Sequence, residues 1–314
     1  MSAIRINGIR VGHEMFHLRQ YLDPPDSEPA SLLYQTLAGK GINLPCLGVE
    51  CNSYGYTMSC CLEDNLSLNQ GEDDPRAVCM VSVYPHGSKT EILGYLLSLF
   101  ARKEIYFYHM VSSNAMISFV IAQEDKAGLL ALLEGTFDLP PTHTPYEPGF
   151  HEETAAFVKK RYQETRAYFQ EKKIKTYGFD VEPELELTLI RCRLDQLDLA
   201  GQCIGALDTK FYFSTAFGHE RDISLYWLTR DEDNKENPFT KDIDYIREKA
   251  DLVSFHGPHF GDRFGIFNAA AACLEAAGLN LILAGCTGAS ISLILPAGQG
   301  SAALPALEKG FEAP

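Results

Sequence analysis

The sequence contains an internal repeat, and this repeat limits the folds that the chain can adopt. Residues 90–140 align without a gap with residues 264–314, which lie 174 positions further on, and nine of the 51 aligned positions are identical. Apolar positions also coincide, at a period of 3.6 in the predicted helices and of 2 in the predicted strands. The pattern indicates that one structural unit occurs at least twice.

Each copy predicts the same order of elements. The last copy indicates strand, helix, strand, strand and helix in residues 250–256, 266–277, 279–284, 290–295 and 301–309. Residues 285–288 are expected to form the turn between the two middle strands. With room for a closing strand, this order is the ferredoxin-like βαββαβ arrangement.

Two shorter groups of elements precede the copies. The first is strand, helix, strand and strand in residues 14–22, 27–37, 42–51 and 54–62, with Ser27 as the expected helix N-cap. The other has the same order in residues 185–194, 197–207, 210–216 and 223–229. We therefore predict an α+β fold of tandem ferredoxin-like units that pair into continuous antiparallel sheets. The four units are residues 1–74, 75–141, 181–249 and 250–314.

Two more helices are predicted between the units. Residues 152–173, inside a linker at 142–180, have acidic residues in the first turn and two lysines in the last, which suits the helix dipole. This helix either packs on one of the units or mediates dimerisation. Residues 242–248 are also expected to be helical.

Composition excludes several classes of function. The net charge of −15 and the pI near 5.0 disfavour binding to nucleic acids or to an anionic membrane surface. No apolar run approaches the length of a membrane span, and no signal peptide is indicated. The nine cysteines are scattered and form no Cys-x-x-Cys pair, so reduced thiols in a cytoplasmic protein are expected.

The segment His13-Glu-Met-Phe-His17 matches the His-Glu-x-x-His pattern of zinc proteases. That chemistry needs a helix, which places two imidazoles four residues apart on one face. Here the repeat indicates a strand, in which these residues would lie more than about 10 Å apart. A zinc hydrolase is therefore a remote alternative, and no metal site is predicted.

The loop at residues 257–265 is the better candidate site. Its glycines allow backbone amides to turn toward a ligand, and the start of the next helix suits a carboxylate. Asp262 would hold an amino group and Arg263 a second carboxylate. Alternatively, the glycines serve the geometry of a strand-to-helix turn alone, and both interpretations stay open.

A family resemblance extends this reading. Residues 253–266 read Val-Ser-Phe-His-Gly-Pro-His-Phe-Gly-Asp-Arg-Phe-Gly-Ile, and the pattern continues through residues 277–281 to 290–295. This run resembles an ACT domain of the regulatory half of aspartokinases. Residues 77–140 are similar, with residues 112–121 as the strand pair, so the resemblance covers about 130 residues. The first and third units are similar only in position and element order.

The resemblance implies ferredoxin-like units that pair side by side, often through a dimer, and bind an amino acid at the pair interface. By position, it assigns ligand contacts to His86, Ser88, Lys89, Thr90 and Asn114, and to Gly261, Asp262, Arg263, Gly265 and Thr287. The chain departs from aspartokinases in two ways. The kinase half with its Lys-Phe-Gly-Gly-Thr-like signature is not found, and Phe260 stands where methionine is common.

The sequence therefore predicts a non-catalytic cytoplasmic protein that binds an amino-acid effector without a cofactor. Its expected partners are a second copy in a dimer and a partner enzyme, with neither nucleic acid nor membrane. The alternative is a structural or regulatory subunit whose ACT surfaces assemble with other chains and bind no small ligand.

Overall fold

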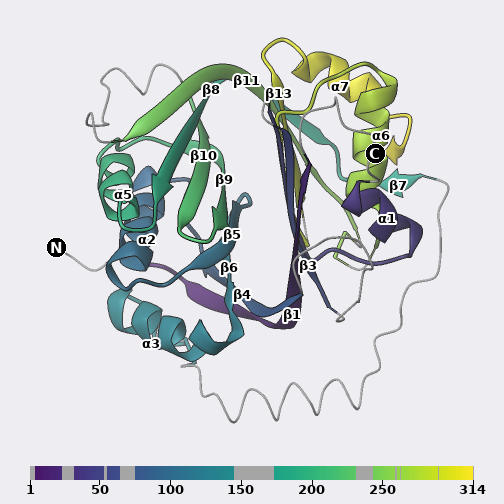
Figure 1. Ribbon diagram of the computed structural model, residues 1–314. Helices are drawn as coiled ribbons and strands as arrows, with labels where there is room; N and C mark the ends of the chain where they lie inside the picture. The colour runs from purple at the N-terminus through teal and green to yellow at the C-terminus, as the bar shows by residue number, and fades with distance from the viewer. Residues whose placement is uncertain are drawn as a thin grey trace.

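The computed structural model describes residues 4–22, 32–52, 55–63, 75–144, 173–230, 243–258, 260–261, 263–288 and 290–313. The α+β class and a large antiparallel sheet are confirmed (Figure 1). No helix in these ranges is long and apolar enough to cross a membrane. The elements are, in chain order, β1 (Gly8–Leu22), α1 (Leu33–Gly39), β2 (Cys46–Asn52), β3 (Gly55–Leu62), β4 (Arg76–Tyr84), α2 (Thr90–Arg102), β5 (Phe107–Ser112), β6 (Ile117–Ala122), η1 (Gln123–Asp125), α3 (Lys126–Thr136), β7 (Ile174–Lys175), β8 (Phe179–Arg193), α5 (Leu197–Gly205), β9 (Phe211–His219), β10 (Asp222–Thr229), β11 (Asp244–His256), α6 (Ile266–Ala276), β12 (Leu283–Thr287), β13 (Ser290–Pro296), α7 (Gly300–Leu307) and β14 (Phe311–Glu312).

The sequence repeat corresponds to repeated structure. The order β4, α2, β5, β6, α3 in unit 2 recurs as β11, α6, β12, β13, α7 in unit 4. In both sets the last strand lies between the other two. The period of 3.6 in the sequence arises because one face of each helix is buried. Ile92 and Leu96 on α2, and Ile266 and Ala270 on α6, lie in apolar clusters.

Twelve strands form one closed sheet, in the order β1-β3-β2-β12-β13-β11-β8-β10-β9-β5-β6-β4, and β4 pairs with β1. β1 pairs with β4 through residues 8–17 and with β3 through residues 16–22, so one strand serves two units. β8 likewise pairs with both β10 and β11. The sequence did not predict this closure, and the division into four units stays a prediction because strands pair across its boundaries.

Neighbouring units are joined within one chain. Strands β2 and β12 connect unit 1 to unit 4, with α1 packed beside α6, and we call this contact the 1–4 junction. Strands β5 and β9 connect unit 2 to unit 3, with α2 beside α5, and this is the 2–3 junction. Figure 1 shows α2, α3 and α5 on one side of the barrel and α1, α6 and α7 on the other. An apolar core lies beneath each helix layer, and a third lies inside the barrel.

Inside the barrel, glycines on one side of the sheet leave room for large side chains from the opposite side. A Cβ placed on Gly48 would lie 2.2 Å from Cε1 of His109 and 2.8 Å from Cε1 of Phe217. A Cβ on Gly285 would lie 2.5 Å from Cζ of Phe213. Gly48 and Gly285 are partners across the 1–4 junction, and His109 and Phe217 are partners across the 2–3 junction. The two junctions therefore pack directly against each other.

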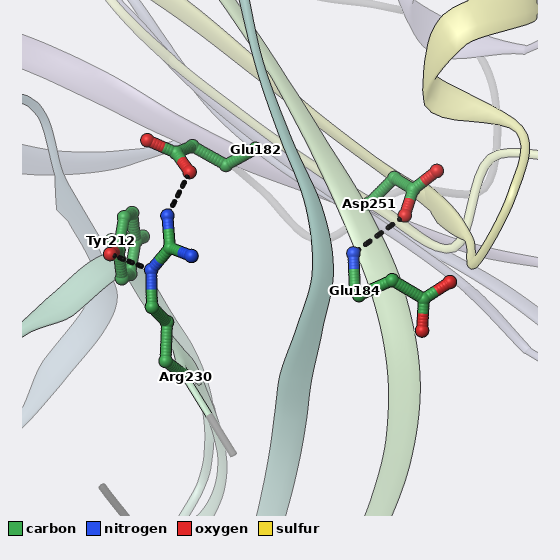
Figure 2. A network of polar contacts seen from close by, with 5 residues as sticks. All are labelled: Glu182, Glu184, Tyr212, Arg230 and Asp251. Atoms are coloured by element: carbon green, nitrogen blue, oxygen red, sulfur yellow. Dashed lines mark hydrogen bonds and ion pairs between the residues drawn. The ribbon is translucent and has the colours of Figure 1, made fainter. Parts of the chain in front are cut away.

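A buried carboxylate holds the bend in β11. The pairing of β11 with β8 shifts register between Ala250 and Leu252, and Asp251 lies at this bulge with only 2% of its surface exposed. Its carboxylate accepts hydrogen bonds from the amides of Glu184 (3.0 Å; Figure 2) and Gly300 (2.7 Å), the first residue of α7. These bonds compensate for the burial of the charge and tie both strands to α7.

An exposed set of polar side chains links the strands of unit 3. Arg230 donates to Glu182 at 2.6 Å and to the hydroxyl of Tyr212 at 2.5 Å, as Figure 2 shows. An exposed ion pair of this kind contributes at most about 1 kcal/mol, so Asp251 matters more for the fold.

Two local predictions were wrong. Residues 242–248 were expected to be helical, but β11 begins at Asp244, and its residues alternate between exposed and half-buried positions as they pair with β8. The predicted turn at residues 285–288 is largely strand, because β12 extends to Thr287. The N-cap Ser27 and residues 152–172 of the helix predicted for 152–173 lie outside the described residues. Strand β7, in the predicted linker, pairs in parallel with β14.

The helices at the 2–3 junction are in close backbone contact. A Cβ on Gly94 of α2 would lie 2.3 Å from the carbonyl oxygen of Gly201 and 2.4 Å from the amide nitrogen of Gly205, both on α5. A Cβ on Gly201 would lie 2.5 Å from the carbonyl oxygen of Gly94. Any side chain at these positions would push α2 and α5 apart.

We predict that Gly94→Ala destabilises the protein by about 1–3 kcal/mol, because backbone atoms cannot move aside as a flexible side chain can. The matched control is Gly128→Ala in α3, where a Cβ meets nothing within 4 Å. That change should stabilise the protein by up to about 1 kcal/mol, through helix propensity. Urea unfolding followed by the emission of Trp227, the single tryptophan, measures both. Equal stabilisation by the two changes would contradict the close contact of α2 and α5.

Candidate functional site

A pocket lies at the 1–4 junction, between α1 and α6 and over strands β2 and β12. Its cavity volume is about 40 Å³, several times the space that one water molecule needs. Both units contribute to its walls, so it exists only while they are paired. It is lined by Tyr34, Ala38, Ile42, Asn43, Leu44, Leu47, Phe260, Arg263, Gly265, Ile266, Phe267, Asn268, Cys286, Thr287 and Ile291.

Three of the predicted ligand residues, Arg263, Gly265 and Thr287, lie in this wall. Gly265 is in the left-handed region, with φ of 75°, and caps α6, which begins at Ile266. A Cβ there would lie 3.5 Å from that of Ala38 on α1, an ordinary van der Waals distance, so it is the left-handed φ that favours glycine at this position. The first amides of α6 have no acceptor within the helix, and the helix dipole makes this end attractive to a carboxylate.

Unit 1 holds the loop of unit 4 in place. The side-chain amide of Asn43 donates to the carbonyl oxygen of Gly261, another predicted ligand residue. Next to it, the rings of Tyr34 on α1 and Phe267 on α6 pack edge to face, with centroids 5.0 Å apart. Burial raises the pKa of Tyr34 to about 12, so its phenol stays neutral. Asp262, also predicted as a ligand, lies outside the described residues.

In unit 2, the predicted His86 is buried and fully hydrogen-bonded. Its Nε2 donates to the carbonyl oxygen of Ser113 at 2.8 Å, and its Nδ1 accepts from the amide of Ser88 at 2.8 Å. The ring stacks on Phe211 of unit 3, with centroids 4.9 Å apart. Burial lowers the pKa of His86, so the neutral ring joins two units.

The neighbouring predicted residues also bond to unit 3. The hydroxyl of Thr90 donates to the carbonyl oxygen of Thr209 at 3.1 Å and accepts from the Thr209 amide at 3.2 Å. The carbonyl oxygen of Ser88 accepts from the amide of Phe211 at 2.9 Å. Lys89 forms a backbone bridge with Lys210, and Asn114 is exposed in the turn between β5 and β6. Ser88, Lys89 and Thr90 thus lie together at the 2–3 junction, and no described contact joins Asn114 to it.

Several residues of the pocket were missed by sequence reasoning. Tyr34, Asn43 and Leu47 come from unit 1, to which no ligand contact was assigned. Nothing in one sequence shows that unit 1 pairs with unit 4, because the contact connects residues more than 200 positions apart.

The fold matches a solved structure over almost its full length. Aspartate kinase from Synechocystis aligns with 99% of this chain at a TM-score of 0.74 and 15% sequence identity. The chain shares the fold of the part of that structure with which it aligns. It spans 56% of the length of that enzyme. No protein-family model and no curated protein matches the chain.

Two shorter structures related to aspartate kinase also align with part of the chain. The regulatory subunit from Thermus thermophilus, in its ligand-free form, covers 44% of this chain and 99% of its own, at 18% identity and a TM-score of 0.37. A putative C-terminal regulatory domain from Porphyromonas gingivalis W83 covers 43% of this chain and 97% of its own, at 13% identity and a TM-score of 0.30.

The His-Glu-x-x-His segment lies in strand β1, as predicted. His13 is exposed, with Nε2 4.0 Å from the carboxylate of Glu63. His17 is buried, its Nε2 lies 2.9 Å from the hydroxyl of Ser59, and its ring stacks on Tyr108. Across the part of the chain that the structure describes, no three His, Cys, Asp or Glu residues are grouped to hold a metal ion. The zinc-hydrolase alternative is not favoured.

We predict that His17 makes the protein sensitive to acid. Burial, then the charges of His109, Arg19 and Arg76, lower its pKa from 6.5 to about 3. Below pH 6.5 the unfolded chain therefore binds a proton that the folded chain excludes, so stability is lost as the pH falls. His17 should account for about 2 kcal/mol between pH 7.5 and pH 5.

Urea unfolding of wild type and His17→Gln at pH 7.5, 6 and 5 measures this contribution. The variant should lose less stability on acidification, while His86, whose pKa is also lowered by burial, keeps part of the dependence in both proteins. Identical pH dependence of the two proteins would show that His17 titrates normally.

Proposed function

We propose that the chain is a non-catalytic regulatory protein that binds an amino acid in the pocket at the 1–4 junction. The observation that supports this most strongly is the composition of the pocket wall. Residues of α1 and β2 lie on one side and residues of α6 and β12 on the other, and the helix N-terminus at Gly265 suits a carboxylate. The resemblance to ACT domains and the fold shared with an aspartate kinase agree with this role.

A ligand in this position would favour the arrangement in which units 1 and 4 are closed on each other. It would shift the protein toward that arrangement only by its difference in affinity for the closed and open states. The Asn43 contact to Gly261 would report the same closure, since it connects the two units beside the pocket.

The partners are part of the proposal. We propose that occupancy is passed to a partner enzyme or to a second copy in a dimer. Because the twelve strands form a closed sheet, a partner cannot extend that sheet at an open edge, and we expect it to contact the helix layers.

A thermal-shift measurement with each of the twenty amino acids tests the ligand class. An amino acid at 10 mM with a Kd near 0.1 mM would stabilise the protein by about 2.7 kcal/mol, or roughly 5 °C in Tm. Ala38→Leu, which places a larger side chain in the wall, should abolish the shift. Ala127→Leu, on the exposed face of α3, should leave it unchanged.

A flat response of the wild type to all twenty amino acids would overturn this function and favour a subunit that assembles without a small ligand. A shift retained in Ala38→Leu would place the ligand elsewhere.

A further inference from the structure

The composition of the pocket wall bears on which amino acid the pocket can hold. The inference drawn from it rests on the proposed function. Most of its side chains are apolar and come from both units, including Ile42, Leu44 and Leu47 from unit 1 and Ile266 and Ile291 from unit 4. Among the described residues of the wall there is no carboxylate. A ligand with a cationic side chain would therefore bury its charge against apolar atoms, which is costly.

Two polar side chains of the wall already have partners. The amide of Asn43 donates to the Gly261 carbonyl, and the hydroxyls of Thr287 and Ser290 are hydrogen-bonded at 3.2 Å. Cys286 is buried and its thiol pKa is raised by that burial, so it contributes a neutral and weakly polar surface. A ligand hydroxyl or amide placed against the apolar side chains of Ile42, Leu44 and Ile291 would lose water without gaining a partner.

The size of the cavity limits the ligand further. Its volume of about 40 Å³ is far below the roughly 150 Å³ of an engineered protein cavity that holds benzene. An aromatic side chain does not fit this space, whereas one to three methyl or methylene groups do. The α-carboxylate would then face the first turn of α6, whose residues Ile266, Phe267 and Asn268 all line the pocket.

We propose that the pocket binds an amino acid with a small aliphatic side chain, of alanine to valine size. The side chain enters the apolar wall, and the carboxylate is held at the start of α6. Ile42, Leu44 and Ile291 determine the specificity, because their methyl groups provide no hydrogen bond to a polar competitor.

Isothermal titration calorimetry of the full chain with valine, alanine, threonine, lysine and phenylalanine tests this specificity. Valine and threonine have the same shape, so their ratio isolates the hydroxyl. We expect valine or alanine to bind most tightly and threonine to bind roughly 10- to 100-fold more weakly than valine. Lysine and phenylalanine should bind more weakly still.

Two variants connect the preference to the pocket. Leu44→Ser should weaken valine binding at least about 10-fold and reduce the difference between valine and threonine. Leu132→Ser, the same change at a half-buried position of α3 in the other helix layer, should change neither.

Tighter binding of threonine, lysine or phenylalanine than of valine and alanine would overturn the specificity and leave the proposed function intact. Absence of binding by all five, together with a flat panel of the twenty amino acids, would overturn both. An unchanged preference in Leu44→Ser would show that this wall does not select the ligand.

Discussion

The contact between the two junctions inside the barrel holds the rest of the structure in place. Gly48 and Gly285 leave room on one side of the sheet, and His109, Phe217 and Phe213 fill that room from the other side. Protein interiors are close-packed, so this match in size fixes how near the two sides can approach. It also fixes β2 beside β12, and thereby α1 beside α6, which is where the pocket lies. The candidate site thus depends on residues that never contact a ligand.

The two junctions have the same topology and differ in what fills them. At the 2–3 junction, glycines bring α2 and α5 into backbone contact, and the loop at residues 85–90 uses its polar groups to bond to unit 3. At the 1–4 junction, the large rings of Tyr34 and Phe267 lie between the helices and leave a cavity beside them. The 2–3 junction is therefore held by direct contacts, whereas the 1–4 junction contains a cavity that a ligand could occupy.

The local features of the fold could be predicted from the sequence, and its closure could not. Periods of 3.6 and 2 identified most helices and strands, and the repeat identified units 2 and 4. The error at residues 242–248 arose because a short charged segment, half-exposed in a strand, has no clear period; only its pairing with β8 decides its structure. Closure depends on long strands such as β1, which pair on both sides, and pairing between distant segments leaves no local signal.

For the site, the glycine-rich loop before α6 led to Arg263 and Gly265, which line the pocket, because the need for a left-handed residue before a helix is visible in a sequence. The same reasoning, applied to residues 86–90, pointed to a loop that hydrogen-bonds to unit 3 at the 2–3 junction. The other half of the pocket, which includes Tyr34 and Asn43, could not be predicted, because it too depends on pairing between distant segments of the chain.

Hydrogen exchange, read by mass spectrometry with and without a saturating small aliphatic amino acid, tests the central claim most directly. Since both walls of the pocket would be held by one ligand, the account predicts slower exchange in the first turn of α6 and in residues 42–47 together, with α2 and α5 unchanged. Slower exchange at α2 and α5 instead, or no change in either segment of the pocket, would contradict the claim that the 1–4 junction is the binding site.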